Sequence, residues 1–142
     1  MESLTVPGIM DSLDIIADYV LMAAKEAELD KKCTYKLRLA VDEIATNIVV
    51  HAYEEGGCSG DIFIESRIDK ENLTIIIEDT ASPFDPSVKI KEEMKRVKQP
   101  LENRPIGGLG IFLVIDGVDD FDYQRIENKN RNIFVVKRDK AS

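Results

Sequence analysis

Residues 39–53 read LAVDEIATNIVVHAY, a stretch in which apolar side chains recur at helical spacing. The pattern begins near Lys31 and stops before Gly56-Gly57, which predicts an α-helix from about residue 31 to residue 53. Glu43 and Asn47 are four residues apart and lie on one side of this helix, at the edge of its apolar stripe. His51, one turn further on, is expected almost on the buried side.

Glu43 and Asn47 carry the functional groups of a site that handles a metal ion and a hydroxyl group. A carboxamide oxygen can ligate Mg²⁺, and a neighbouring carboxylate can orient or deprotonate an attacking hydroxyl. The competing interpretation is a solvated polar helix face, and an E-x-x-x-N pair by itself does not exclude it.

The segments on either side of this helix predict a two-layer α+β fold. An earlier helix is expected over residues 13–27. Strands are expected over 4–6, 61–68, 73–78, 121–126 and 132–137, with turns at 70–72 and 127–130. The run 73–77 is continuously β-rich, so it should be a central strand. The apolar stripe of the first helix consists of Leu13, Ile16, Ala17, Val20, Leu21, Ala24 and Ala27. This order favours a mostly antiparallel sheet with helices on one face.

A second candidate site lies where the predicted central strand ends, in the sequence EDTASPFDP at residues 78–86. Asp79 would be a hydrogen-bond acceptor held on rigid structure, able to accept a hydrogen bond from an exocyclic amine. The alternative is an ordinary strand-ending turn with aspartate as its cap, which is common.

A third candidate site is the sequence RPIGGLGIFLV at residues 104–114, in which glycines open a predicted helix that runs to about Gly117. The first turn of a helix exposes unpaired backbone N–H groups at its positive end, which suits a phosphate. The segment before it, residues 89–104, holds six Lys/Arg against three Asp/Glu and could close over a triphosphate. A solvated charged helix explains the individual lysines equally well.

Composition narrows the class of protein. The 142 residues fit a single domain spanning 1–142, and the net charge of −8 argues against nucleic-acid binding. Two cysteines and one histidine cannot assemble a structural zinc site. No apolar run approaches the roughly 20 residues that cross a bilayer, and residues 1–7 do not resemble a signal peptide. A cytoplasmic protein with no membrane partner is expected.

The joint order of the three sites resembles the N, G1 and G2 boxes of the GHKL (histidine-kinase-like) ATPases, and most closely the small serine-protein-kinase anti-sigma factors of bacteria. The motifs that carry the resemblance are LAVDEIATN with HAY, PFDP and RPIGGLG. It implies a Bergerat-type α+β two-layer sandwich with a mixed, mostly antiparallel sheet, helices on one face and an ATP lid at roughly residues 85–107.

The resemblance also implies roles for particular residues. Glu43 matches the catalytic base, Asn47 the Mg²⁺ ligand and Asp79 the residue that reads the adenine amino group. The phosphate-binding positions match Arg104, Gly107, Gly108, Leu109 and Gly110. One position departs from the family pattern, because the G1 box normally reads D-x-G and here Ala81 replaces the glycine. An alanine there is strained if the backbone φ is positive and harmless if φ is ordinary.

The function implied is an ATP- and Mg²⁺-dependent serine kinase that acts as an anti-sigma factor. Its expected partners are a STAS-domain anti-anti-sigma protein, a sigma factor or similar regulator, and a second copy of itself. The alternative is a non-catalytic protein-binding module in which Ala81 marks a weakened nucleotide pocket. The catalytic domain of a sensor histidine kinase is disfavoured, because no dimerisation helix with a phosphoacceptor histidine is found in the 142 residues.

Overall fold

The computed structural model describes residues 1–83, 114 and 117–138 of the chain. Its elements are β1 (Leu4–Pro7), a 3₁₀ turn (Met10–Ser12), α1 (Leu13–Glu26), α2 (Lys31–Asn47), a π-helical segment (Ile48–Glu54), β2 (Asp61–Ile68), β3 (Asn72–Asp79), β4 (Asp120–Ile126) and β5 (Lys129–Lys137). No helix among these described residues is long and apolar enough to cross a membrane.

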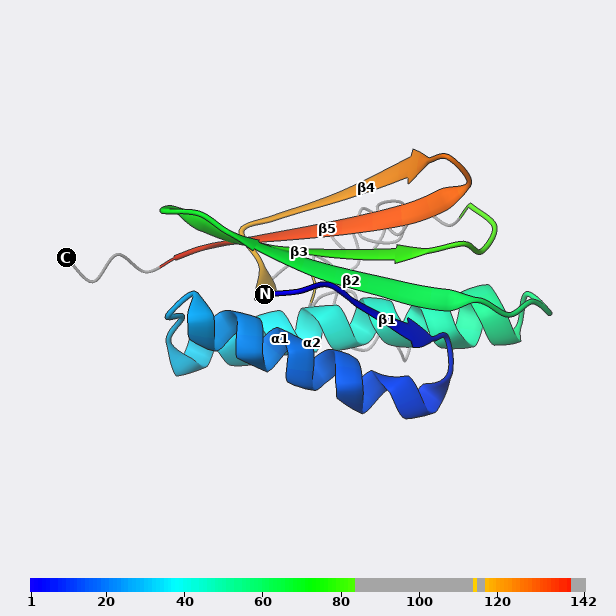
Figure 1. Ribbon diagram of the computed structural model, residues 1–142, viewed down its shortest axis with the longest axis horizontal. Coiled ribbons are helices and arrows are strands. Elements are labelled where there is room, and N and C mark those ends of the chain that lie inside the picture. The colour runs from blue at the N-terminus through cyan, green and yellow to red at the C-terminus, as the bar shows by residue number, and fades with distance from the viewer. Residues whose placement is uncertain (84–113, 115–116, 139–142) are drawn as a thin grey trace, which may run out of the picture.

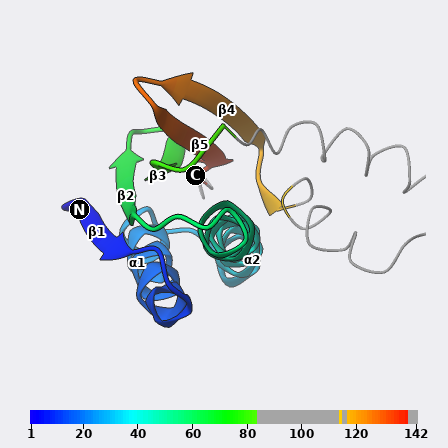
Figure 2. The same ribbon diagram turned by 90° about the vertical axis from the view of Figure 1, so that its right-hand side faces the viewer.

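The five strands form one sheet in the order β1-β2-β3-β5-β4, and each recorded pairing is antiparallel. Both helices lie on the same side of this sheet, as Figures 1 and 2 show. The two-layer α+β prediction is therefore confirmed, and β3 is the central strand as expected. The sheet is antiparallel wherever it is described, so the "mixed" part of the expectation finds no parallel pair there.

The core lies between the sheet and the helices. Alternate residues of the inner strands face the helices and are buried, while Ile76 and Glu78 of β3 are buried on the opposite face. The helix-facing apolar residues are Ile62, Ile64, Leu73, Ile75, Ile77, Phe134 and Val136. The predicted stripe of α1 is confirmed except at Leu21, which is 38% exposed. Tyr19 and Ala23, which the predicted stripe did not include, are buried.

The predicted second helix changes its hydrogen bonding near its end. It is α-helical only to Asn47, and π-helical bonding follows over Ile48–Glu54. A helix closed by i→i+5 bonds carries more residues per turn, so the side chains after Asn47 are rotated relative to an α-helix. His51 is therefore turned outward, with its side chain 41% exposed and its Nδ1 2.9 Å from Glu55 Oε2, and the expectation of a nearly buried His51 is wrong. Tyr53 is turned inward and is 2% exposed.

The last hairpin has a tighter turn than the sequence predicted. Ile126 pairs with Lys129, so the loop contains only Glu127 and Asn128, both with positive φ (48° and 65°). Positive φ at both central residues is the signature of a type I′ turn, whose twist matches that of the strands it joins. As a result β5 begins at Lys129 and not at residue 132, which brings Asn130 into the sheet.

Candidate functional site

Glu43 and Asn47 both lie half-buried on α2, at the boundary where the sequence placed them. The neighbouring carboxylate, Asp42, has a different environment. Burial raises its pKa above the usual range, while Arg38 Nε, 3.6 Å from Asp42 Oδ2, acts to lower it. Asp14 of α1 is a further source of negative charge at Asp42. Asp42 thus belongs to the contact between α1 and α2, which leaves Glu43 as the carboxylate on the flank that carries Asn47.

Asp79 is the last residue of β3 and faces the helix layer, with 2% of its surface exposed. Its Oδ1 accepts two hydrogen bonds, from the Ala81 N–H at 3.0 Å and from Asn130 Nδ2 at 2.9 Å. Burial raises the pKa of Asp79, whereas these two hydrogen bonds and the charge of Arg125 act to lower it. Within the described part of the chain the carboxylate is held by one oxygen, which leaves Oδ2 to meet a ligand donor.

Ala81 has no positive φ and is 3% exposed, with its methyl group in the hydrophobic core. The strained backbone that would have made Ala81 a disabling substitution is therefore absent. Its N–H donates to Asp79 Oδ1, which makes the strand end an aspartate-stabilised turn, so the alternative interpretation of Asp79 as a turn cap is confirmed. One oxygen of Asp79 performs this structural role.

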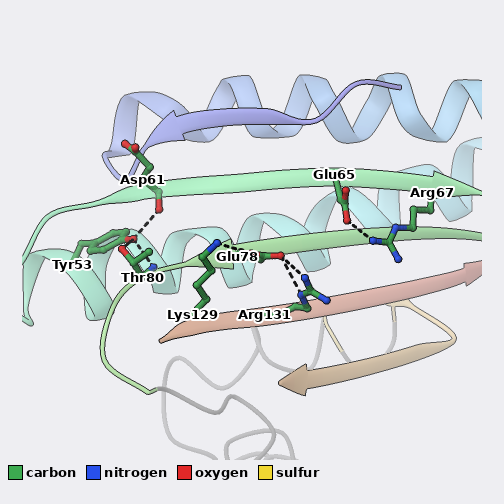
Figure 3. Close-up of polar contacts among 8 residues, drawn as sticks. All are labelled: Tyr53, Asp61, Glu65, Arg67, Glu78, Thr80, Lys129 and Arg131. Atoms are coloured by element: carbon green, nitrogen blue, oxygen red, sulfur yellow. Dashed lines mark hydrogen bonds and ion pairs between the residues drawn. The ribbon is translucent and has the colours of Figure 1, made fainter. Parts of the chain in front are cut away.

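Tyr53 joins the two candidate sites. Its hydroxyl donates to the Asp61 carbonyl at 2.8 Å and accepts from the Thr80 N–H at 3.1 Å, so it connects the end of the π-helical segment to both strands at the open end of the β2–β3 pair (Figure 3). Two glycines make room for it, because a Cβ on Gly8 would come within 2.4 Å of the Tyr53 ring and one on Gly60 within 2.8 Å of its hydroxyl. The helix that carries Glu43 and Asn47 is thereby fixed to the turn that carries Asp79.

The sequence indicated no function for the residues of the β4–β5 hairpin that surround Asp79. Asn130 stands directly opposite Asp79 in the sheet register, and Arg125 Nη1 donates to the Ala81 carbonyl at 2.8 Å. The signal that could have revealed Asn130 is its place after a two-residue Glu-Asn turn, which sets the register of β5. The predicted phosphate-site residues Arg104, Gly107, Gly108, Leu109 and Gly110, and the lid at 85–107, lie outside the described residues.

A depression of about 490 Å³ opens on the sheet face that points away from the helices. Its lining includes Asp61, Phe63, Glu65, Glu78, Lys129 and Arg131. Arg131 holds the Glu78 carboxylate with Nη2 at 2.8 Å and Nε at 3.1 Å, and Lys129 Nζ lies 4.0 Å from Glu78 (Figure 3). Glu43 and Asn47 belong to the helix layer on the opposite side of the sheet. Asp79 and Thr80 also line this depression, so it adjoins the strand end that carries the candidate nucleotide site.

The arrangement agrees with comparisons to known proteins. The serine-protein kinase RsbW of Bacillus cereus strain G9842 is 34% identical over 92 residues, which cover 64% of this chain and 56% of that relative. The same-named protein of strain B4264 is also 34% identical, and that of Bacillus thuringiensis subsp. konkukian is 33% identical, over the same shares. The chain thus spans little more than half the length of these relatives.

The family comparison covers more of the chain. The profile of the family described as "Histidine kinase-like ATPase domain" matches residues 9–137, from the 3₁₀ turn before α1 to the end of β5. That span contains α2 with Glu43 and Asn47, the Asp79 turn and both hairpins. This chain belongs to the histidine kinase-like ATPase domain family.

Proposed function

We propose that this chain binds ATP with Mg²⁺ and transfers the terminal phosphoryl group to a serine of a partner protein. The observation that carries the proposal is Asp79, a buried carboxylate that the described residues hold through Oδ1 alone at the end of the central strand. A buried charge with an oxygen left for a ligand is costly for a fold and is typical of a recognition site. The exocyclic amine of adenine is the donor that fits it.

Glu43 and Asn47 would supply the remaining chemistry on the helix side. Mg²⁺ keeps several waters and binds through one or two protein oxygens together with substrate phosphates. The half-buried Glu43 and Asn47, one turn apart on α2, offer protein oxygens in that number. Asn47 would be the protein ligand, and Glu43 would accept the proton of the attacking serine hydroxyl. Arg104, Gly107, Gly108, Leu109 and Gly110 would hold the phosphates.

The partner assignments rest on the named relatives and on the sequence resemblance. The relatives are called serine-protein kinases, which supports a protein substrate. We propose an anti-sigma factor in a partner-switching circuit that phosphorylates a STAS-domain antagonist, binds a sigma factor and forms a homodimer. The non-catalytic alternative relied on Ala81, and the ordinary backbone of Ala81 removes the strain argument for it.

Calorimetric titration with ATP tests the first half of the proposal. The wild-type protein should bind ATP in the micromolar range only when Mg²⁺ is present, and Asn47→Ala should lose the Mg²⁺-dependent part. Lack of heat at millimolar ATP would reject a nucleotide site and favour the non-catalytic binding module.

Transfer of labelled phosphate from ATP to a purified STAS-domain protein tests the second half. Glu43→Gln should keep ATP affinity and abolish transfer. Asp42→Asn is the matched control, because it neutralises the adjacent carboxylate on the side of α1 and should leave transfer intact. Retained transfer in Glu43→Gln would exclude Glu43 as the base.

A further inference from the structure

The side chain of Asn130 makes more contacts with the Asp79 turn than any group the sequence predicted. Asn130 is 1% exposed, and its Nδ2 lies 2.9 Å from Asp79 Oδ1, 3.0 Å from the Ser82 carbonyl and 3.3 Å from the Ala81 carbonyl. Three acceptors surround this one atom. It must therefore be the amide nitrogen, so the orientation of the carboxamide is fixed by its surroundings.

Two further side chains of the same hairpin complete the arrangement. The Tyr123 hydroxyl donates to Asn130 Oδ1, which holds the amide plane from behind. Arg125 Nη1 donates to the Ala81 carbonyl at 2.8 Å. The β4–β5 hairpin thus contacts the short turn of residues 79–82 through Arg125 and Asn130, which lie 44 to 51 residues further along the chain, while Tyr123 holds Asn130 in place. We call Tyr123, Arg125 and Asn130 the hairpin clamp.

We propose that Asn130, supported by the rest of the hairpin clamp, is the positioning residue of the nucleotide site: it orients the Asp79 carboxylate so that Oδ2 accepts a hydrogen bond from the base. This inference rests on the proposed function, in which Asp79 reads the exocyclic amine. Asn130 acts through Asp79 and is not itself a catalytic residue.

The hairpin clamp should also affect the pKa of Asp79. When Asp79 is protonated, one of its two oxygens carries a hydrogen atom. That oxygen is then less able to accept a hydrogen bond from an amine. Hydrogen bonds to a carboxylate favour its ionised form, so Asn130 opposes the rise in the pKa of Asp79 that burial causes. Among the described residues, the charged group that acts on the pKa of Asp79 is Arg125 of β4, and the titratable hydroxyls next to the turn are those of Tyr123, bonded to Asn130, and Tyr53, bonded to Thr80. Removal of Asn130 should therefore make ATP binding more sensitive to acid.

The test compares Asn130→Leu, which keeps the volume and removes the hydrogen bonds, with Asn132→Leu. Asn132 is one pleat along β5 on the same face, is 2% exposed and has no recorded bond to Asp79. The carboxyl ¹³C signal of Asp79 is titrated by NMR in the nucleotide-free protein, and ATP affinity is measured by calorimetry from pH 5 to pH 8.

Asn130→Leu should raise the NMR pKa of Asp79 by about one unit and move the pH midpoint of ATP binding upward by the same amount. At pH 7 its ATP affinity should fall about tenfold, the equivalent of one hydrogen bond. Asn132→Leu should leave the pKa of Asp79 in place. If Asn130→Leu does not fold, Tyr123→Phe removes only the hydroxyl that orients the amide and should give a smaller shift of the same sign.

An affinity loss that is equal at every pH, with the pKa of Asp79 unmoved, would overturn the positioning role and leave Asn130 as a structural residue. An equal pKa shift in Asn132→Leu would overturn it as well. Wild-type protein that binds no ATP refutes the proposed function instead, and the NMR titration still decides whether Asn130 controls Asp79.

Discussion

The hydroxyl of Tyr53 gives the sharpest test of how the helix layer is fixed to the strand ends. Tyr53→Phe keeps the ring, which is 2% exposed, so no cavity opens and only the hydroxyl is lost. Two short hydrogen bonds disappear with it, to the Asp61 carbonyl at 2.8 Å and from the Thr80 N–H at 3.1 Å, together with a longer contact to Thr80 Oγ1 at 3.4 Å.

The expected loss follows from these two bonds. At a net 0.5–1.5 kcal/mol for each hydrogen bond, Tyr53→Phe should lower the free energy of unfolding by about 1–3 kcal/mol. For a domain of this size the midpoint of thermal unfolding should fall by about 4 °C per kcal/mol. Urea unfolding followed by circular dichroism measures the first quantity, with an unchanged m-value expected because the ring and the fold remain.

The chain offers a matched control and a second variant. Tyr35 lies on α2 and is 59% exposed, so Tyr35→Phe should change the unfolding free energy by less than about 0.5 kcal/mol. Gly60→Ala would place a Cβ 2.8 Å from the Tyr53 hydroxyl and should be destabilising. Combined with Tyr53→Phe its effect should be smaller than the sum, because the nearest clashing atom is gone while Thr80 Oγ1 at 2.9 Å and the Tyr53 ring carbon at 3.0 Å remain. A Tyr53→Phe protein as stable as Tyr35→Phe would refute the reasoning.

Three further predictions concern the site and the open face of the sheet. Ala81→Gly should lower the unfolding free energy by about 1–2 kcal/mol, since a buried methyl is lost and the unfolded chain gains freedom; a urea titration checks this. Asp79→Asn should be at least as stable as wild type at pH 7 while losing ATP binding, as unfolding and calorimetry together would show. Arg131→Ala should cost about 1–3 kcal/mol in urea unfolding, because Glu78 is left buried with its strongest partner gone.

The sign of the pH dependence at Asp79 provides an independent check. The pKa of Asp79 is raised in the folded state from 3.8, so the folded protein binds the proton more tightly than the unfolded chain. Wild-type stability from this group should therefore rise as the pH falls through the raised pKa and level off below about 3.8. Asp79→Asn should lack that component. If both proteins show the same pH profile of stability, Asp79 is not a buried group with a raised pKa.

The predictions for Arg131→Ala and Ala81→Gly can each be contradicted by a further measurement. Arg67 is 66% exposed and pairs with Glu65 at 2.8 Å, so Arg67→Ala should change stability by no more than about 0.5 kcal/mol. A similar loss in Arg67→Ala and Arg131→Ala would show that burial of the Glu78 carboxylate is unimportant. An Ala81→Gly variant more stable than wild type would mean that the backbone at Ala81 is strained after all.

The sequence by itself determined the layers of this protein and the local positions of its motifs. Periods of 3.6 and 2 residues are set by local backbone geometry, so the helices, the strands and the central place of β3 could be predicted from apolar spacing alone. The same spacing placed Glu43 and Asn47 one turn apart at the edge of a buried stripe, which the structure reproduces.

Only the tertiary structure decided what surrounds Asp79. The inward turn of Tyr53 depends on π-helical hydrogen bonding that apolar spacing does not reveal, and the contact with Thr80 joins residues 27 apart in the chain. The partner of Asp79 depends on strand register, and moving the start of β5 from residue 132 to Lys129 is what places Asn130 opposite it. Register is fixed by the twist of a two-residue turn and by the burial of alternate side chains across the whole sheet, which a short motif does not contain.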